Sequence, residues 1–337
     1  MGSDMARGTQ PTAEIDAENG DARGHVAVMP GESVRGLGIG ATDVVVDCTA
    51  GGGGHLRLFA AEAARVIGLD RDLRAFADDA AGGIARSLSN VTLVHAPFSD
   101  IEKALRDLSL DHVDVVFADL GVSSFQLNEG ERGFSFQKDA PLDMRMDTSA
   151  GETAAELVAR LPVDELANIL FRYGDESRSR KIARYIKDRA PTTTLGLASA
   201  VLSAVAGQRG KVHPATRTFQ ALRIAVNNEL QELEQLLAAL PRVLRVGGRA
   251  GFLTFHSLED RLVKLAFRET AFRPLTKKPL TPSDDEVRGN PRSRSAKLRV
   301  AVFDPDWRAR AKAAFKRDDE AEDGDDEEEA DAAGADA

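Results

Sequence analysis

The sequence predicts an α/β protein in which a parallel sheet is interrupted by a helical insertion. Short strand-like segments alternate with helical segments over residues 43–119. Residues 152–206 then show helical patterns only, and a strand pattern returns at residues 249–255. Strands separated by helices pair in parallel through right-handed crossovers. Both stretches should therefore contribute to one sheet.

The first stretch should contribute four strands and the helices between them. The strands are expected at residues 43–48, 65–69, 91–95 and 113–120. The helices are expected at residues 56–64, 73–88 and 101–108, of which the second has the weakest pattern. This order is that of consecutive βαβ units.

After the fourth strand, the chain should continue with a long loop. Residues 121–147 are polar, contain glycine and lack strand patterns, which is typical of a functional loop. Residues 215–240 are expected to form one long helix, with Pro214 at its start and Pro241 at its end. Its apolar stripe consists of Phe219, Leu222, Val226, Leu230, Leu233, Leu237 and Leu240. Strands at residues 249–255 and 297–303 should complete the sheet.

Charge is unevenly distributed along the chain. Residues 318–337 contain twelve Asp and Glu and no Lys or Arg, and residues 1–24 are also acidic. Without these two segments the net charge is +5, which suits a nucleic-acid partner but is also ordinary for a chain of this size. Both end segments are expected to be disordered. No apolar stretch is long enough for a bilayer or a secretory signal, so a cytoplasmic protein is expected.

The single cysteine, Cys48, limits the possible chemistry. One cysteine excludes an intrachain disulfide, a multi-cysteine zinc site and a three-cysteine iron–sulfur cluster. His213 has no possible metal ligand at useful spacing, and we expect no metal site.

A glycine run follows the first strand and opens the next helix. Gly51, Gly52, Gly53 and Gly54 are more than a tight turn needs, and they let a ligand approach the backbone and the helix N-terminus. A dinucleotide fingerprint requires a further glycine at position 56 or 57, which are Leu and Arg. The string from Asp47, Asp-x-Thr-x-Gly-x-Gly, instead resembles the first motif of class I methyltransferases, which use S-adenosyl-L-methionine (SAM).

Two further residues fit a nucleoside cofactor. Asp70 ends the second strand, where a carboxylate can accept both ribose hydroxyls, although it could equally cap a helix, as could Asp72. Phe98 follows the third strand, where an aromatic ring can pack on adenine or simply belong to the core.

Asp119 ends the fourth strand, at the edge of the sheet that borders the active crevice. It could contact the cofactor or a reacting amine, or cap the strand end. Methylation of cytosine C5 needs a cysteine nucleophile, and Cys48 beside the glycine loop is poorly placed for this. Methylation of an exocyclic amine needs only positioning and proton acceptance. The Pro-Pro-aromatic tripeptide common after such an acidic residue is absent here, so this likeness is partial.

Several polar strings together resemble the bacterial 16S rRNA cytosine-N4 methyltransferases, the MraW-like family. They occupy residues 25–29, 47–55, 68–72, 119–127, 131–136, 141–147, 213–225, 255–261 and 290–295, in order. The resemblance implies a Rossmann-like class I methyltransferase core, SAM as cofactor, and N4-methylation of a cytidine in the decoding centre of 16S rRNA in the small ribosomal subunit. It also implies SAM contacts by Gly53, Gly54, His55, Asp70, Phe98, Asp119 and Gln126, with Asp119 as the catalytic residue.

The resemblance also implies a division of the chain. The core should comprise residues 25–127 and 223–317, with a mainly helical substrate-recognition domain inserted at residues 128–222. The disordered leader at 1–24 and the acidic tail at 318–337 lie outside the resemblance. Phe125 and Asn128 depart from the family's usual Pro and Asp, and Phe125 removes a backbone restraint beside Gln126.

Several residues are candidates for RNA contacts. Phe134 and Phe136 could hold a splayed-out base or anchor the loop. Two basic clusters could bind phosphates or form solvated faces. They comprise Arg178, Arg180, Lys181, Arg184, Lys187 and Arg189, and Arg292, Arg294, Lys297 and Arg299. His256 is expected to be structural or to reach the crevice, and Ser257 with Asp260 resembles a helix-capping pair.

Two alternatives remain open. The protein could be a SAM-dependent methyltransferase with another acceptor, such as DNA or protein, or a non-catalytic rRNA-binding assembly factor that has kept the fold. The intact glycine loop and Asp70 argue against the second. The sequence leaves the oligomeric state open, a dimer included.

Overall fold

The computed structural model describes residues 27–206, 213–269 and 271–310, so the leader and the acidic tail lie outside the described residues. Its sheet has the strand order β3-β2-β1-β4-β5-β7-β6. The strands are β1 Val44–Asp47, β2 Arg65–Asp70, β3 Val91–His95, β4 Val113–Asp119, β5 Leu244–Thr254, β6 Phe272–Pro274 and β7 Lys297–Phe303. The pairs from β3 to β5 are parallel, whereas β7 is antiparallel to both β5 and β6. The predicted parallel sheet is thereby confirmed.

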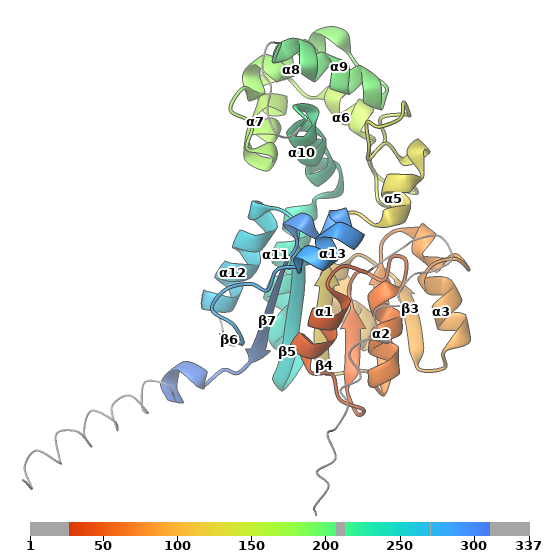
Figure 1. Ribbon diagram of the computed structural model, residues 1–337, viewed down its shortest axis with the longest axis vertical. Helices are drawn as coiled ribbons and strands as arrows, with labels where there is room; N and C mark the ends of the chain where they lie inside the picture. Colours follow the sequence, from red (N-terminus) through yellow and green to blue (C-terminus); the bar gives the residue numbers. More distant parts are fainter. Residues whose placement is uncertain (1–26, 207–212, 270, 311–337) are drawn as a thin grey trace, which may run out of the picture.

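Helices cover both faces of this sheet, which makes the core a three-layer structure (Figure 1). One face packs on α1 Pro30–Leu37, α2 Gly54–Glu62 and α3 Ala81–Ser87. The other packs on α4 Ile101–Asp107, α11 Glu229–Val243 and α12 Ser257–Glu269. Side chains of alternate strand residues enter each face, as expected for a sheet buried on both sides.

Most of the remaining helices come between β4 and β5 in the sequence. In space they lie beyond the end of the sheet where the parallel strands terminate (Figure 1). They are α5 Ser124–Asn128, α6 Ala154–Arg160, α7 Val163–Gly174, α8 Ser179–Arg189, α9 Thr194–Ala204 and α10 Ala215–Asn227, and a short α13 Asp284–Gly289 precedes β7. Residues from Phe134 to Leu222 form a hydrophobic cluster separate from the two sheet cores. We propose that residues 128–222 are the inserted domain of a core at 25–127 and 223–317.

The predicted helix over residues 215–240 is wrong, because the chain breaks between α10 and α11. Asn228 has a left-handed backbone with φ 51°, and Asn227 is buried and bonded to another segment. The apolar stripe runs through the break because it serves two cores: Phe219 and Leu222 pack in the insertion, whereas Leu233 and Leu240 pack against the sheet. Pro241 lies inside α11 and does not end it.

Smaller differences have local causes. The weak helix expected at residues 73–88 is a 3-10 turn, Leu73–Phe76, followed by α3. Strand β5 begins five residues before the predicted start, since it passes through Gly247 and Gly248 at a register shift against β4. The short strand β6 and helix α1 were not predicted. In the described part of the chain, no helix combines the length and hydropathy that a bilayer crossing requires.

Candidate active site

A cavity of about 340 Å³ lies where the parallel strands end, a volume within the usual range for ligand pockets. The order of strands reverses between β1 and β4, and in open sheets ligands bind outside the strand ends at such a point. Residues from the ends of β1, β2, β4 and β5 line the cavity. It is also lined by all seven residues expected to contact the cofactor: Gly53, Gly54, His55, Asp70, Phe98, Asp119 and Gln126.

The glycine loop forms one wall and leads into α2. Gly51 and Gly53 have φ of 44° and 82°, the region that favours glycine. A Cβ at Gly53 would lie 2.2 Å from Ile84 Cδ1 and 3.1 Å from Ala81 Cα. The loop therefore needs glycine both for its conformation and for its packing against α3.

Asp70 is held rigidly below this loop. Its carboxylate accepts hydrogen bonds from the amides of Gly51 (2.7 Å) and Asp72 (2.8 Å). The capping role left open for Asp70 belongs to Asp72, which accepts from the Arg74 amide. Burial raises the pKa of Asp70 to about 6. A carboxylate with both oxygens fixed and lone pairs to spare fits the two hydroxyls of a ribose.

Asp47 and Asp119 lie at the ends of the adjacent strands β1 and β4. Thr49 links them, since its hydroxyl accepts from the Asp119 amide (2.7 Å) and its amide donates to Asp47 (3.0 Å). Asp47 Oδ2 and Asp119 Oδ1 are buried without a hydrogen-bond partner among the described residues. Burial raises the pKa of Asp47 to about 7, and burial with repulsion from Asp47 and Glu259 raises that of Asp119. Such paired buried carboxyls suit a cationic ligand.

His55 joins the glycine loop to Asp119. Its Nε2 lies 3.0 Å from the Val28 carbonyl oxygen, and its Nδ1 lies 3.6 Å from Asp119 Oδ2. The ring is buried and packs on Phe59 and Phe117. These contacts fix the orientation of the imidazole toward the cavity.

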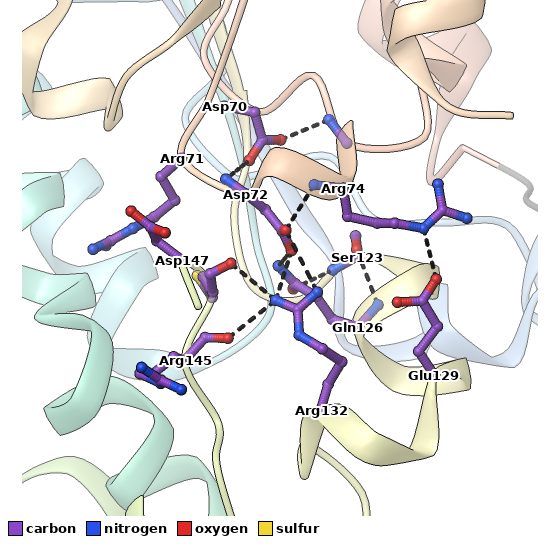
Figure 2. A network of polar contacts seen from close by, with 12 residues as sticks. Asp70, Arg71, Asp72, Arg74, Ser123, Gln126, Glu129, Arg132, Arg145 and Asp147 are labelled. Carbon is purple, nitrogen blue, oxygen red and sulfur yellow. Dashed lines mark hydrogen bonds and ion pairs between the residues drawn. The ribbon is translucent and has the colours of Figure 1, made fainter. Parts of the chain in front are cut away.

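A polar network connects the cofactor side of the cavity to the start of the insertion (Figure 2). Asp72 accepts from Gln126 Nε2 (2.9 Å) and Arg132 Nη2 (2.9 Å). Gln126 also forms a capping box with Ser123 at the N-terminus of α5. Gln126 thus lines the cavity with its amide already engaged in holding the loop.

The two departures from the family pattern take part in related contacts. The Arg74 guanidinium lies 4.2 Å from the centre of the Phe125 ring and pairs with Glu129. Asn128 accepts from Arg292 Nη2 at 3.0 Å, across a long sequence separation. Phe125 therefore replaces a backbone restraint with a cation–π contact.

Asn227, at the break between α10 and α11, is a second connection that the sequence did not indicate. Its side chain accepts from the Met146 amide (2.7 Å) and donates to the Met144 carbonyl (2.7 Å). Its own carbonyl accepts from Arg71, the residue after Asp70. The two segments that join the insertion to the sheet are thus bonded to each other and to the cofactor side.

The cavity also contains charged residues that the sequence analysis missed. Arg223 and Glu229 form an ion pair with two bonds of 2.8 Å, and both side chains are largely buried. Glu259 is buried beside them. Arg223 and Glu229 lie six positions apart and were expected on one continuous helix. Only the break at Asn228 brings both to the cavity, so no local pattern could have identified them.

Helix α12 begins differently from the prediction. Glu259 accepts from the amides of Phe255 (2.8 Å) and His256 (3.3 Å), whereas Ser257 and Asp260 do not cap the helix. Asp260 instead pairs with Arg299 and Lys297. Ligand atoms of Glu229, His256 and Glu259 lie within 4.8 Å of one another. A cation there would compete with Arg223 for Glu229 and with His256, 3.0 Å away, for Glu259.

Some of the candidates for RNA contacts are buried or bonded within the protein, whereas others are exposed. Phe134 is buried, and Phe136 stacks on His213 and contacts Phe219, which favours the anchoring alternative for both. Lys187 bonds the last carbonyls of α6, and Arg299 is held by Asp260. The side chains that remain exposed in the two basic clusters include Arg180, Lys181, Arg184, Arg292 and Arg294.

Comparison with known proteins shows the family to which the chain belongs. The model of the MraW methylase family matches residues 22–303. The chain belongs to the MraW methylase family. It is 54% identical over 284 residues to ribosomal RNA small subunit methyltransferase H of Sorangium cellulosum, covering 82% of this chain and 90% of that protein. The protein of the same name from Synechococcus sp. is 50% identical over 291 residues, covering 82% and 91%.

Solved structures of other methyltransferases are more distant. An rRNA methylase from Streptococcus thermophilus has a TM-score of 0.40 and 10% identity, and covers 81% of this chain and 94% of that chain. Fibrillarin of Aeropyrum pernix with bound SAM has a TM-score of 0.36 and 11% identity, and covers 78% and 67%. For this member of the MraW methylase family, the order and directions of the strands confirm the class I fold expected from the sequence. Membership of a methylase family supports SAM as the methyl donor.

Lowering the pH from 7.5 to 5.5 should weaken SAM binding by about tenfold or more, measured by titration calorimetry. Asp47 and Asp70, with pKa values of about 7 and 6, take up protons over this range and lose their attraction for a cation and for ribose hydroxyls. Affinity should thus rise with pH through these values and level off above them. The Asp70→Asn variant should bind weakly with a shallower pH dependence. A dissociation constant that does not change with pH would contradict this assignment.

In the SAM-free protein, the contribution of Asp47 and Asp70 to stability has the opposite pH dependence to SAM affinity. Their folded pKa values lie above the unfolded values near 4, so the folded state holds more protons between about pH 4 and 7. Their contribution to the free energy of unfolding therefore falls as pH rises through this window. Saturating SAM should raise the melting temperature more at pH 7.5 than at pH 5.5.

Proposed function

We propose that this protein transfers a methyl group from SAM to N4 of a cytidine in the decoding centre of 16S rRNA. The names of its relatives, which refer to the small ribosomal subunit RNA, support this substrate class. The observation that carries the amine as acceptor is Asp119, whose Oδ1 is buried beside the cofactor loop without a hydrogen-bond partner among the described residues. An exocyclic N–H is the donor that such an oxygen fits.

The environment of Cys48 supports the same choice of atom. Methylation at cytosine C5 requires a thiolate that adds to the ring. Cys48 is buried, and its burial, with repulsion from Asp47, raises the pKa of the thiol well above its usual value. The neutral thiol is therefore the stable form, and amine chemistry is favoured over covalent addition.

The proposed reaction needs few groups from the protein. Bound SAM supplies an electrophilic methyl group on a sulfonium ion. Asp119 accepts a hydrogen bond from N4–H, orients the nitrogen lone pair, and takes the proton that N4 loses as the carbon–nitrogen bond forms. A cation beside Asp119 favours its ionised form despite the burial that raises its pKa.

We assign the cofactor contacts to Gly53, Gly54, His55, Asp70, Phe98, Asp119 and Gln126, all of which line the cavity. Phe98 packs against the sheet core and would cover the adenine. The inserted domain and the exposed side chains of the basic clusters would hold phosphates of the RNA. This substrate implies a cytoplasmic enzyme.

The deciding experiment is methyl transfer from labelled SAM to small ribosomal subunits that lack the modification, with nucleoside mass spectrometry of the product. N4-methylcytidine at one decoding-centre position is the expected result. Methylation of another atom, of DNA or of protein would replace the acceptor and leave the cofactor assignment intact. SAM binding is measured in parallel, because a protein that binds rRNA without SAM would be an assembly factor.

A further inference from the structure

The part of the cavity away from the cofactor loop contains a buried ion pair. Arg223 lies four residues before the end of α10 and Glu229 is the first residue of α11, with Nε–Oε1 and Nη2–Oε2 distances of 2.8 Å. Their side chains are 15% and 10% exposed. Replacing a buried pair of this kind by apolar residues is often neutral or stabilising, so stability alone does not account for it.

The position of this pair in the sheet indicates what it faces. Five of the seven assigned cofactor residues lie at or after the ends of β1, β2 and β3, on one side of the reversal in strand order, whereas Asp119 and Gln126 follow β4. Asp119, at the end of β4, borders the reacting amine under the proposed function. Arg223, Glu229, and Phe255 and Glu259 after β5 also line the cavity. Glu259 is close enough to Asp119 to repel its carboxyl, so under the proposed function we place the acceptor ring in this part of the cavity.

The hydrogen bonds of Arg223 leave one end of its guanidinium available. Among the described residues its partner is Glu229, which engages Nε and Nη2. No described residue accepts from Nη1, so the end-on edge of the guanidinium, an N–H of Nη1 beside the second N–H of Nη2, can donate a parallel pair. Glu229 therefore fixes the plane of the guanidinium. Burial opposes the charge of Arg223, but the attraction of Glu229, with a smaller contribution from Glu259, outweighs it and raises the pKa of the guanidinium.

Cytosine presents a matching edge. Its N4 amine is flanked by N3 and then O2, both of which are acceptors, whereas uracil has an N–H donor at N3. Paired donors on arginine recognise paired acceptors on a base with good geometry. We propose that Arg223, clamped by Glu229, reads the N3/O2 edge of the cytosine whose N4 is methylated. This inference rests on the proposed function and makes Arg223 its specificity-determining residue.

The test combines protein variants with an altered base. Small-subunit particles carry either cytidine or 3-deazacytidine at the target position, so that N3 is replaced by a C–H group. The R223Q/E229Q double variant removes the contact without leaving an unpaired buried charge. Its kcat/KM for cytidine particles should fall about tenfold to hundredfold, the discrimination typical of a bidentate base contact. Its SAM dissociation constant should stay within about twofold of the wild-type value.

The decisive result is the coupling between the two changes. Replacing N3 should reduce the wild-type rate about as much as the double variant does, and should affect the variant little. If replacing N3 lowers kcat/KM by the same factor in the wild-type enzyme and in the double variant, the two changes are independent and the proposal is overturned. The E102Q/R242Q variant is the matched control, since that exposed ion pair has the same two-bond geometry outside the cavity, and it should behave as wild type.

Two further measurements test the proposal if the double variant does not fold. Arg223→Lys retains the positive charge facing Glu229 but lacks the paired N–H donors of a guanidinium. It should show the same loss of kcat/KM, and it replaces the double variant in the test if that variant does not fold. Wild-type enzyme that methylates cytidine and 3-deazacytidine particles equally fast overturns the inference without any variant. Wild-type enzyme that makes no N4-methylcytidine at all contradicts the proposed function itself.

Discussion

Replacing Asp119 by Ala should lower kcat for methyl transfer about a thousandfold, the loss expected when a group that positions and deprotonates the acceptor is removed. Asp119 and Asp47 both have a buried oxygen that lacks a partner among the described residues, and of the two Asp119 lines the cavity. Asp119→Asn keeps an acceptor oxygen but cannot take a proton, and should lose about a hundredfold. Single-turnover transfer to small subunits measures both losses.

The structure predicts how these variants differ from a general loss of folding. Removing a carboxyl that repels Asp47 and Glu259 should leave the melting temperature of the SAM-free protein unchanged or higher. Asp111→Ala, an exposed residue just before β4, is the control and should retain full activity. An Asp119→Ala enzyme with more than a tenth of wild-type kcat would remove Asp119 from the chemistry.

Gly53→Ala should abolish measurable SAM binding and destabilise the protein by about 2–4 kcal/mol. A left-handed backbone costs a residue with a Cβ roughly 1–2 kcal/mol. Ile84 Cδ1, which would lie 2.2 Å from that Cβ, can rotate away, but the Ala81 backbone at 3.1 Å cannot. The loop must therefore shift, and it would lose its approach to the cofactor. Titration calorimetry and urea unfolding measure the two effects.

Gly151 provides the matched control for this substitution. Its φ is 78°, close to the 82° of Gly53, but a Cβ there would have no atom within 4 Å. Gly151→Ala should thus cost only the backbone term, about 1–2 kcal/mol, and leave SAM affinity unchanged. Adding Ile84→Ala to Gly53→Ala should not restore stability or SAM binding, because the contact with the Ala81 backbone remains and a buried side chain is lost. A Gly53→Ala protein that binds SAM normally would show that the loop does not hold the cofactor.

The sequence predicted the sheet well because its signals are local. Strands β3 and β7 match the expected residues, β1, β2, β4 and β5 differ at their ends, and the short β6 was not predicted. The glycine loop and Asp119 were recognisable because chain positions next to strand ends determine their place in a parallel sheet. Each of the seven expected cofactor residues lines the cavity, and their contacts with SAM stay predictions.

The remainder of the site depends on contacts between distant segments. The break at Asn228 follows from hydrogen bonds of Asn227 to Met144 and Met146, which no periodic pattern in α10 or α11 reveals. Without that break, Arg223 and Glu229 would not meet at the cavity. The helix-capping pair at Ser257 and Asp260 was wrong for a similar reason, since Arg299 on β7 attracts Asp260 away from the helix end.

The bonds between Met146 and Asn227 also bear on how fast the chain can fold. Strands β4 and β5 are neighbours in the sheet, yet the whole insertion separates them in sequence. Helical contacts within the insertion are local and form early. Once they join Met146 to Asn227, the chain that must close between the strands shrinks to roughly a third of its length, which lowers the closure cost by about 1 kcal/mol. On this loop-closure argument, the inserted helical segment should speed assembly of the sheet by about fivefold relative to a flexible linker of equal length.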